Sequence, residues 1–532
     1  MKVVFVTLYD ESARGARYVA SAVKSAGHSI AFIHFKAFRW GTIPRQDTEQ
    51  LAWAIAQSPY QLREITHEGD RFHPYPSVAT DTERRFLAEL IDQLKPDVVG
   101  MSFGTHAFPR AVEITNLIRE TCPGVPIVWG GVHATVDPES SIPHADAICI
   151  GEGEEAFVEY LAHPKRTDIA GFWFRTPTGI IKNPLRPLIQ DLDSLAWPIY
   201  GADEYQVSEN RIERRMVEDP AYIACNFYSE TTRGCPFTCS YCVHSTTREL
   251  YPGQRYVRPR SSESVIAEIR QFRSRFGLQA VMPFFDEILF MHKKRFAHFA
   301  DLYKREIHHP FWGFAHPKTT DREMLEIARD AGSVEISVGI QTGSERIARD
   351  IYRRPIDREA ILRLTRDIHE ARAGRLVLNM LADCPFEEEQ DLRDTFDLLL
   401  EIPRPFLLQL SRVVPFPNTA LARMKCDVPP LPQRVRDFWY QLFLLTQKVR
   451  VDIETLRGLS ADPYLREHPE ILSNIVHWIM EKSERPEYSS ALRTSEPAAP
   501  PTCQPSPPYR DDFLRRVYRR MRGWFDRTGT AR

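Results

Sequence analysis

Three cysteines close together are the residues of this chain best suited to metal chemistry. Cys235, Cys239 and Cys242 stand in the spacing C-x3-C-x2-C within the stretch TTRGCPFTCSYCVHS. Iron–sulfur clusters are usually held by four thiolates, so three predict a [4Fe–4S] cluster with one iron open to another ligand. A zinc site, a cluster completed by a distant cysteine and a coincidence of core cysteines are the alternatives. A zinc site usually carries a second Cys or His pair, and none follows locally.

The elements around this loop alternate between strand and helix patterns from residue 223 to about 450. About six βα units of this kind predict an open or partial barrel whose functional face lies at the strand ends. The cysteine loop follows the first of these strands. The apparent strands cover residues 224–229, 279–285, 311–315, 334–340, 375–382 and 406–414.

The N-terminal part of the chain, up to residue 165, also alternates between strand and helix. The apparent strands are 2–8, 29–35, 97–103, 126–131 and 146–151, and the helices are 16–28, 82–96 and 108–120. This alternation predicts a parallel sheet with helices on both faces. Ligands of such sheets bind at the carboxyl ends of the strands, which here carry the sequences SFGT, GGVHAT and GEGEE.

The stretch RGCPFTCSYC, with Tyr241 before its last cysteine, resembles the signature of radical S-adenosylmethionine (SAM) enzymes. The resemblance implies a partial (βα)6 barrel and makes Cys235, Cys239 and Cys242 the ligands of a [4Fe–4S] cluster. It also implies that SAM chelates the fourth iron through its amino and carboxylate groups. An electron from the cluster then cleaves SAM to a 5′-deoxyadenosyl radical, so an external donor such as flavodoxin or ferredoxin is expected.

Other barrel segments resemble the SAM-binding positions of this family less sharply. The segments FFDEILF, VGIQTGSERI and VVPFPNT match strand ends, and the resemblance gives SAM contacts to Tyr241, Asp286, Glu287, Gln341, Ser344 and Phe416. An ordinary strand-end loop is the alternative for each segment. Cys384, in LADCPFEEE, is a weak catalytic candidate as a proton donor or thiyl in the substrate pocket; its alternative is a small buried residue.

The strand ends of the N-terminal sheet resemble the cobalamin-binding domain that precedes many radical SAM enzymes. The matching segments are VGMSF, GGVHAT with DPE, and GEGEEAF. The resemblance implies a slot for the nucleotide tail of cobalamin and a backbone that approaches the corrin at glycines, which alone allow such contact at low cost. The residues so assigned are Ser102, Gly130, Gly131, His133, Gly151 and Gly153.

One position departs from the pattern of cobalamin domains. Many of them carry D-x-H-x-x-G after the first strand, with the histidine as a ligand of cobalt, whereas this chain reads Asp10-Glu11-Ser12-Ala13-Arg14-Gly15. Cobalt is therefore expected to lack a histidine ligand from position 12, as is common in the cobalamin-dependent radical enzymes. A degenerate domain without cobalamin is the alternative.

Together these resemblances imply an α/β protein with a Rossmann-like, flavodoxin-like cobalamin domain followed by a partial (βα)6 radical SAM barrel and a helical C-terminal region. The implied activity is a methyltransferase that moves methyl from methylcobalamin to an unactivated carbon or phosphorus after hydrogen abstraction. The alternative is a cyclase or rearrangement enzyme resembling the anaerobic magnesium-porphyrin cyclase. A cobalamin sensor is a third class, against which the intact cysteine triplet argues. The expected substrate is a small or amphiphilic molecule.

Composition and charge set the remaining expectations. The net charge of −2 gives no pull toward nucleic acid, and no apolar run of about 18 residues predicts a membrane helix. The N-terminus does not resemble a signal peptide, so a cytoplasmic protein is expected. The predicted organisation is a cobalamin domain at 1–165, a connector at 166–222, the barrel at 223–432, helices at 433–484, a proline-rich linker at 485–508 and a basic tail at 509–532.

The tail combines an apolar stripe at helical spacing with basic faces. Eight arginines and three aspartates between residues 510 and 532 leave a net charge of +5. A basic amphipathic helix on a tether can lie at an anionic membrane surface. Docking on the protein itself or on a partner is the other interpretation of the tail.

Overall fold

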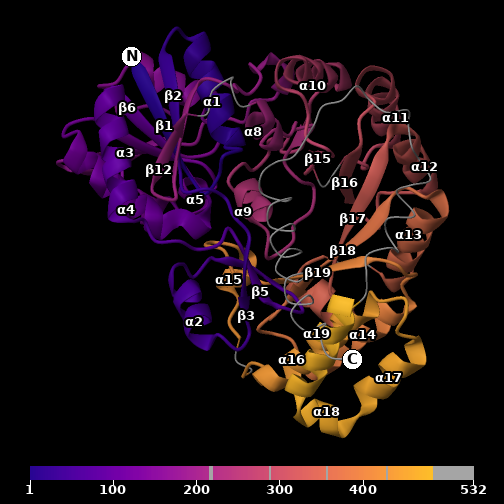
Figure 1. Cartoon of the computed structure of the whole chain (residues 1–532). Coiled ribbons are helices and arrows are strands. Elements are labelled where there is room, and N and C mark those ends of the chain that lie inside the picture. Colours follow the sequence, from indigo (N-terminus) through magenta and orange to yellow (C-terminus); the bar gives the residue numbers. More distant parts are fainter. Residues whose placement is uncertain (215–219, 287–288, 355–356, 427–428, 483–532) are drawn as a thin grey trace, which may run out of the picture.

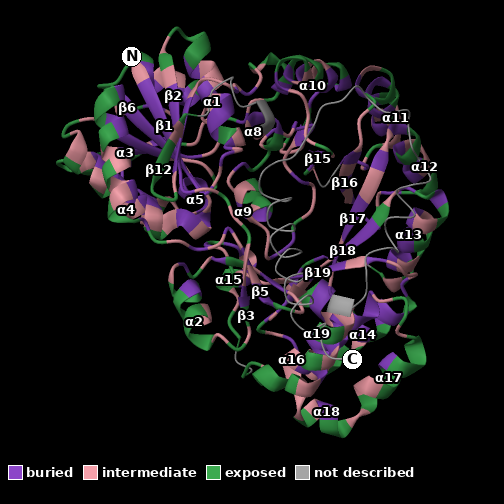
Figure 2. Ribbon diagram, in the orientation of Figure 1, coloured by how far each residue is buried: buried purple, intermediate pink, exposed green. Residues whose placement is uncertain are grey.

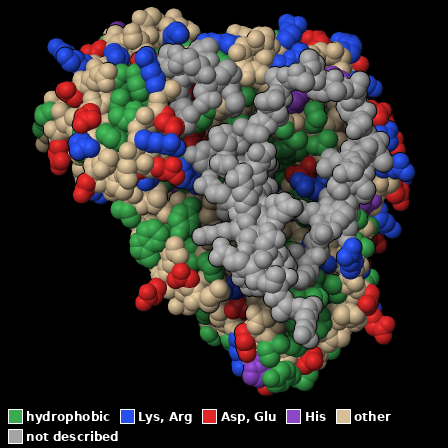
Figure 3. Space-filling model, viewed as in Figure 1, with side chains coloured by type: hydrophobic (Ala, Val, Ile, Leu, Met, Phe, Trp, Pro, Cys, Tyr) green, Lys and Arg blue, Asp and Glu red, His purple; other side chains and the backbone are tan. Residues whose placement is uncertain are grey.

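Two β-sheets covered by helices form the described part of the chain (Figure 1). The structure is a computed structural model that describes residues 1–214, 220–286, 289–354, 357–426 and 429–482. The strands of both sheets are largely buried, while the outer faces of the helices are exposed (Figure 2). Positive and negative side chains are interspersed on the visible surface (Figure 3), as the small net charge leads one to expect. The predicted α/β fold class is confirmed.

The first sheet has a parallel centre in the order β8-β7-β6-β1-β2. Four of its strands match the expected segments closely, and β8 is shorter than expected. Their bounds are β1 (Lys2–Leu8), β2 (Ser29–Phe35), β6 (Val98–Ser102), β7 (Ile127–Gly130) and β8 (Ala147–Cys149). The segment expected as a connector without regular structure extends both edges instead, with β9 (Phe172–Thr176), β10 (Gly179–Lys182), β11 (Asp203–Ser208) and β12 (Arg211–Arg214).

Alternate residues of β1 point to opposite faces of the sheet, as the pleat of a strand requires. Val4 and Val6 belong to the core under α3 (Asp81–Leu94) and α4 (Phe108–Thr121). Val3 and Phe5 belong to the core under α1 (Arg14–Ser25) and α7 (Glu154–Ala162). The helix α3 begins with a capping box in which Thr80 and Glu83 satisfy each other's backbone amides. The predicted layers on both faces are present.

The second sheet holds five parallel strands, in the order β15-β16-β17-β18-β19. They are β15 (Met282–Phe284), β16 (Phe311–Ala315), β17 (Ser333–Gln341), β18 (Arg375–Ala382) and β19 (Leu407–Arg412). Each lies within or nearly at the expected segment. The helices that follow them are α11 (Lys293–Leu302), α12 (Arg322–Ala331), α13 (Arg358–Ala371), α14 (Glu389–Glu401) and α15 (Ala420–Arg423).

The strand expected at residues 224–229 is not one, and this expectation is wrong. Helix α8 (Pro220–Cys225) takes its first residues, and the chain then passes β15 as a loop. Side chains replace the ladder there, because Gln279 donates to the Phe227 carbonyl at 2.9 Å and the Thr231 amide donates to Asp286 at 2.7 Å. The loop leads into the short pair β13 (Thr232–Arg233) and β14 (Arg258–Pro259), with α9 (Val243–Glu249) between them and α10 (Ser262–Phe276) after them.

A segment from the N-terminal part of the chain belongs to the second sheet. After β2 the chain forms β3 (Gly41–Pro44), α2 (Thr48–Ala56), β4 (Leu62–Ile65) and β5 (Gly69–His73). The strand β4 pairs antiparallel with β19, and β5 and β3 continue the sheet beyond it. Ile65 is buried in the core of the second sheet. This insertion therefore covers the edge of β19 that a partial barrel would leave open.

The C-terminal region is helical, as expected for residues 433–484. These helices are α16 (Gln433–Thr446), α17 (Ile453–Ala461), α18 (Pro463–Glu467) and α19 (Pro469–Lys482) (Figure 1). Helix α16 packs against α14, and the other three pack against α16. The proline-rich linker and the basic tail fall outside the described residues. Within the part of the chain that the structure describes, none of the helices has the length and apolar character needed to cross a membrane.

Candidate functional site

A cavity of about 440 Å³ lies between the carboxyl edge of the first sheet and the cysteine loop. The first sheet contributes glycine-rich loops to its wall, and the region of the second sheet contributes β13, α9 and the loop after α9. Helix α5 (Val132–Val136) of the first part contacts α9, which lies between the two sheets (Figure 1). Representative lining residues are Gly131, Gly151, Arg233, Cys235, Val243 and Tyr251.

Glycines form part of the first-sheet wall of the cavity. Gly131 and Gly151 have φ of +88° and +85°, a region that side chains disfavour. A Cβ atom at Gly131 would lie 2.8 Å from the Ser102 hydroxyl, and one at Gly151 would lie 2.0 Å from the Tyr251 hydroxyl. Ser102, Gly130 and Gly153 line the same cavity. These loops fit a ligand that needs close backbone approach, as the corrin and tail of cobalamin do.

His133 lies elsewhere. Its side chain is buried and packs against Phe108 with ring centroids 4.5 Å apart, on the α4 side of the sheet. Burial lowers the pKa of the imidazole to about 4, so it is neutral at pH 7. Of the six residues assigned to cobalamin, His133 alone does not line the cavity. The GGVHAT segment does line the cavity through Gly130 and Gly131, but His133 itself lies in α5 and its ring packs into the core.

Ser12, which stands where many cobalamin domains have histidine, is held locally. Its hydroxyl donates to the Asp10 carboxylate at 2.5 Å, and Ser12 is not among the residues that line the cavity. The histidine that does line the cavity is His244, two residues after Cys242, on the opposite wall. Sequence reasoning passed over His244, although it directly follows the cysteine motif.

The three cysteines of the loop differ in burial and in whether they line the cavity. Cys235 and Cys239 are buried, Cys242 is half-buried, and Cys235 lines the cavity. Arg354 directs a guanidinium N–H to the Cys239 sulfur at 3.6 Å and donates to the Gly339 carbonyl at 2.9 Å. Hydrogen bonds of this kind tune the reduction potential of a cluster. In the described residues, no group of three Cys, His, Asp or Glu side chains surrounds a single metal ion. A [4Fe–4S] cluster would bind each thiolate to a separate iron, and the assignment of these three cysteines as its ligands stays a prediction.

Two of the residues assigned to SAM stand at ends of second-sheet strands. Asp286 lines the cavity and accepts the Thr231 amide at 2.7 Å. Burial raises the pKa of its carboxyl to about 6, against the lowering influence of Arg14. Gln341 ends β17 with φ of +66°, an uncommon conformation for a side chain that brings its amide near Gly339. Glu287 lies outside the described residues.

The other assigned residues have packing partners. Tyr241 meets Tyr352 edge to face with centroids 5.1 Å apart, and Phe416 is half-buried and stacks on Tyr60 at 6.4 Å. The hydroxyl of Ser344 is fully buried and donates to Asp391 at 2.6 Å, which ties the loop after β17 to α14. The roles given to these three residues in binding SAM stay predictions.

Cys384 lies just after β18 in a small buried cluster with Ile347 and Tyr352. Burial, together with the neighbouring Glu387, raises the pKa of its thiol to about 12, so the thiol keeps its proton. It does not line the cavity between the sheets. This environment fits the interpretation of a small buried residue, and a catalytic role stays untested.

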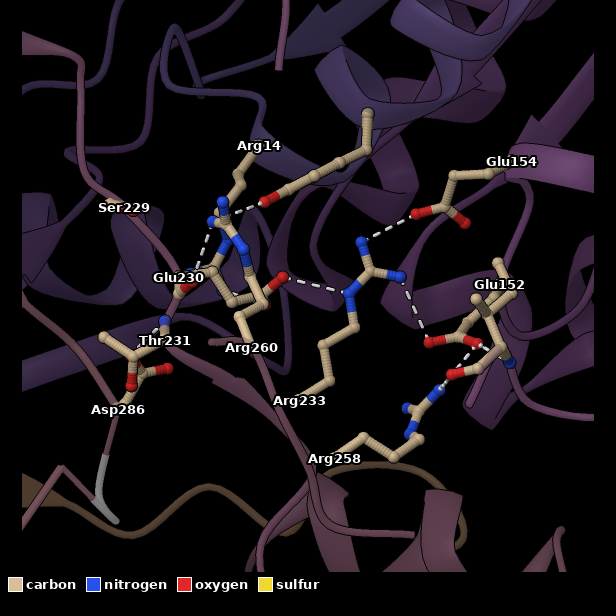
Figure 4. A network of polar contacts seen from close by, with 12 residues as sticks. Arg14, Glu152, Glu154, Ser229, Glu230, Thr231, Arg233, Arg258, Arg260 and Asp286 are labelled. Atoms are coloured by element: carbon tan, nitrogen blue, oxygen red, sulfur yellow. Dashed lines mark hydrogen bonds and ion pairs between the residues drawn. The ribbon is translucent and has the colours of Figure 1, made fainter. Parts of the chain in front are cut away.

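Charged residues that sequence reasoning did not assign form much of the cavity wall (Figure 4). Arg233 contacts Glu152, Glu154 and Glu230 at 3.1, 2.7 and 2.9 Å. Arg258 contacts Glu152 at 2.8 Å. The sequence does show the acidic GEGEE segment and an arginine two residues before Cys235. It does not show that the two segments are in contact, because only the fold brings them together.

Two family models match the chain. The B12 binding domain matches residues 77–161, and the Radical SAM superfamily matches residues 229–399. The chain is 28% identical over 281 residues to an uncharacterized methyltransferase of Pyrococcus horikoshii, covering 51% of this chain and 57% of that protein. It is 25% identical over 390 residues to the anaerobic magnesium-protoporphyrin IX monomethyl ester cyclase of Cereibacter sphaeroides, covering 70% and 60%. The chain thus spans about three-fifths of the length of these two curated relatives.

Solved structures with the same fold include the radical SAM methyltransferase TsrM of Kitasatospora setae, determined with cobalamin and a [4Fe–4S] cluster. It has a TM-score of 0.55 and 14% identity and covers 77% of this chain and 74% of that one. The cobalamin-dependent SAM radical enzyme OxsB has a TM-score of 0.57 and 15% identity and covers 97% and 75%. The matched domains imply cobalamin, a [4Fe–4S] cluster and SAM as cofactors. The chain therefore carries a region that matches the B12 binding domain ahead of a region that matches the Radical SAM superfamily.

Proposed function

We propose that this protein is a cobalamin-dependent radical SAM methyltransferase that methylates an unactivated carbon or phosphorus of a small molecule. The observation that carries the proposal is the shared cavity, whose wall includes both the glycines of the first sheet and Cys235. Two cofactors that act on one substrate must be reached from one space. The cytidylyl-2-hydroxyethylphosphonate methyltransferase of Streptomyces wedmorensis, 24% identical over 313 residues, is among the relatives named as methyltransferases.

The roles of the chain's own residues follow from their positions. Cys235, Cys239 and Cys242 would hold the cluster, and Arg354 would donate to the sulfur of Cys239. Asp286, ionised at pH 7 because its pKa is about 6, can accept a hydrogen bond from an ammonium group such as the amine of SAM. Gly151 and Gly153 would let the backbone meet the corrin. With the cofactors bound, the cluster and SAM supply a radical and cobalamin supplies the methyl group.

The proposal is tested with protein reconstituted anaerobically with iron, sulfide and cobalamin. Reductant, SAM with a labelled methyl group and pools of candidate small molecules are then added. We expect 5′-deoxyadenosine, S-adenosylhomocysteine and transfer of the label into one class of molecule. Reconstituted protein that forms neither nucleoside product would contradict the assignment as a radical SAM enzyme.

A ring cyclase is the second candidate. The cyclase of Cereibacter sphaeroides matches more of this chain than the methyltransferase relatives do, at 70% against 51% for the protein of Pyrococcus horikoshii. Methyl transfer releases S-adenosylhomocysteine, whereas a cyclisation that uses the same cofactors does not. Turnover with 5′-deoxyadenosine but without S-adenosylhomocysteine would therefore favour the cyclase.

An external electron donor is the partner that this proposal requires, because the cluster must be reduced once per radical formed. Flavodoxin or ferredoxin would serve. The substrate stays a small or amphiphilic molecule in this proposal. The absence of histidine at position 12 leaves cobalt without an imidazole from that residue, and a cob(II)alamin spectrum without nitrogen coupling from an imidazole ligand is the expected result.

A further inference from the structure

One guanidinium joins the two halves of the cavity. Arg233 lies in β13 and its three nitrogens contact the carboxylates of Glu152, Glu154 and Glu230 at 2.7 to 3.1 Å (Figure 4). Glu152 lies in the loop between β8 and α7 and Glu154 is the first residue of α7, whereas Glu230 lies just before β13. Arg233 thus links the wall expected at the corrin with the segment that leads to the cluster cysteines.

The contacts continue as a chain of alternating charges. Arg258 contacts Glu152 at 2.8 Å, and Arg14 at the start of α1 contacts Glu230 at 3.5 Å. The sequence of contacts is Arg258, Glu152, Arg233, Glu230 and Arg14, and it crosses three times between the first domain and the region of the cysteine loop. Each carboxylate in this chain is flanked by two arginines, which offsets the cost of its burial.

The charge of Arg233 is fixed by its surroundings. Burial alone would lower the pKa of the guanidinium, but Glu154, Glu230 and Glu152 together raise it well above its ordinary value. Burial would likewise raise the pKa of Glu230, but Arg14 and Arg233 hold it below its ordinary value. Arg233 and Glu230 therefore stabilise each other's charged form.

The connection is close to both candidate cofactor positions. Arg233 precedes Cys235 by two residues, and Gly234 between them has φ of +86° and meets the Tyr256 carbonyl so closely that an added Cβ would lie 2.3 Å from it. On the other side, Glu152 lies between Gly151 and Gly153, which both line the cavity. A shift of the guanidinium must move the cysteine loop, the glycine loop or both.

We propose that Arg233 is a positioning residue that fixes the separation between the cobalamin and the cluster. This inference rests on the proposed function, in which a radical formed at one cofactor must be met by group transfer from the other. Small misplacements of reacting groups cost large factors in rate. A planar guanidinium can serve three carboxylates at once, whereas the ammonium of lysine is a point charge that cannot reach all of them in the same geometry.

The test compares Arg233→Lys, Glu152→Gln and the double variant in the fully reconstituted protein. Arg166→Lys is the matched control, because Arg166 also bridges two carboxylates, Glu159 and Asp168, but on the exposed surface. Iron and cobalamin contents are measured first. The magnetic interaction between the reduced cluster and cob(II)alamin is then measured by electron paramagnetic resonance, because it depends on their separation.

We expect Arg233→Lys to keep its iron and cobalamin, to change the magnetic interaction, and to raise the ratio of 5′-deoxyadenosine to S-adenosylhomocysteine at least tenfold. Glu152→Gln should act in the same direction with a smaller effect. The effect of the double variant should be smaller than the sum of the two single effects, because both changes disturb the Arg233–Glu152 contact. In cofactor-free protein, amide exchange in residues 150–154 and 232–242 should accelerate in Arg233→Lys and stay unchanged in Arg166→Lys.

Three results would overturn the inference. One is an unchanged magnetic interaction in Arg233→Lys, and another is an additive effect in the double variant. The third is loss of iron with normal cobalamin, which would make Arg233 a residue of cluster assembly. The resonance and exchange measurements need no substrate. If the wild-type protein forms no S-adenosylhomocysteine, the methyltransferase proposal fails while these two measurements still decide the role of Arg233.

Discussion

The two walls of the cavity are built from different groups, backbone on the first-sheet side and side chains on the second-sheet side. The first-sheet side offers backbone, because an added Cβ at Gly131 or Gly151 would meet the hydroxyl of Ser102 or Tyr251 at 2.8 or 2.0 Å. The second-sheet side offers side chains, among them the thiol of Cys235 and the half-buried carboxyl of Asp286. A large, preformed cofactor needs room and a fitted surface, whereas a cluster and a charged amino acid moiety need ligands. We therefore expect substitutions that add side-chain atoms to impair cofactor binding on the first-sheet side. Substitutions that remove a side-chain group should impair binding on the second-sheet side.

The largest effect is expected when a cysteine thiol is removed on the second-sheet side. Cys239→Ala should remove the cluster and all formation of 5′-deoxyadenosine, because a buried thiolate ligand cannot be replaced by water at the same place. Iron content, visible absorbance and product analysis measure this. Cys225→Ala is the control, since Cys225 is exposed at the end of α8 and should tolerate the change. A Cys239→Ala protein with a full cluster and turnover would refute the assignment of the ligands.

An addition on the first side should come next. Gly151→Ala places a methyl group 2.0 Å from the Tyr251 hydroxyl, so Tyr251 must move within the cavity wall. We expect cobalamin affinity to fall at least tenfold, which is about 1.4 kcal/mol. Gly124→Ala separates this effect from backbone strain, because Gly124 has φ of +86° but no atom within 4 Å of the added Cβ. Equal affinity in the two variants would mean that Gly151 is a turn residue only.

A milder change on the second side concerns Asp286. The pKa of its carboxyl in the folded protein is about 6, above the ordinary 3.8, because it is buried. The folded state therefore binds the proton more tightly than the unfolded state. The stability from this group is fully present below pH 3.8 and is lost as the pH rises through 6, by about 3 kcal/mol. Because asparagine does not ionise, the Asp286→Asn protein should not show this loss of stability with rising pH.

The measurement for Asp286 is denaturant unfolding of cofactor-free wild-type and Asp286→Asn proteins at pH 4 and pH 7. Relative to the wild type, the variant should gain stability between these two pH values. The pKa shift sets an upper limit on that gain, because nearby charges also titrate. A difference between the proteins that is the same at both pH values would show that Asp286 does not have a raised pKa.

The smallest effect is expected at Cys384, which touches neither wall of the cavity. Cys384→Ala removes one buried sulfur atom from the packed side chains around Tyr352, and it should lower the free energy of unfolding by about 1 kcal/mol. Formation of 5′-deoxyadenosine and of the final product should stay within about twofold of the wild type. Abolished turnover with an intact cluster would instead reveal Cys384 as a catalytic residue.

Local patterns predicted much of this molecule. The strands at 2–8, 29–35, 311–315 and 375–382 have the predicted bounds, because each is a short apolar run between clear turn signals. The cysteine loop and the glycine loops were likewise visible, since their function depends on spacing within one short stretch. The strand expected at 224–229 was wrong because an apolar run of this length can equally pack as a helix end and a loop.

Contacts between distant segments were not predictable in the same way. Nothing in GEGEE identifies Arg233 as the partner of Glu152, since the pairing exists only after two sheets face each other. The edge strands β9 to β12 carry no clear alternation of apolar and polar residues. Their pairing depends on the neighbouring strands and not on their own sequence pattern. His133 shows the same limit within a single motif, because the turn after β7 decides which side of the sheet it faces.

The strand β4 has a consequence for how the protein is made. Ile65 pairs with Leu410, so more than half of the chain must be synthesised after the insertion before its partner strand exists. At ordinary rates of translation this interval lasts roughly 20 to 70 s. During that time the β3–β5 hairpins have no sheet to join, and unpaired strand edges of this kind invite association with other chains. The nascent chain therefore has to keep its N-terminal segment out of aggregates until the last strand of the barrel arrives.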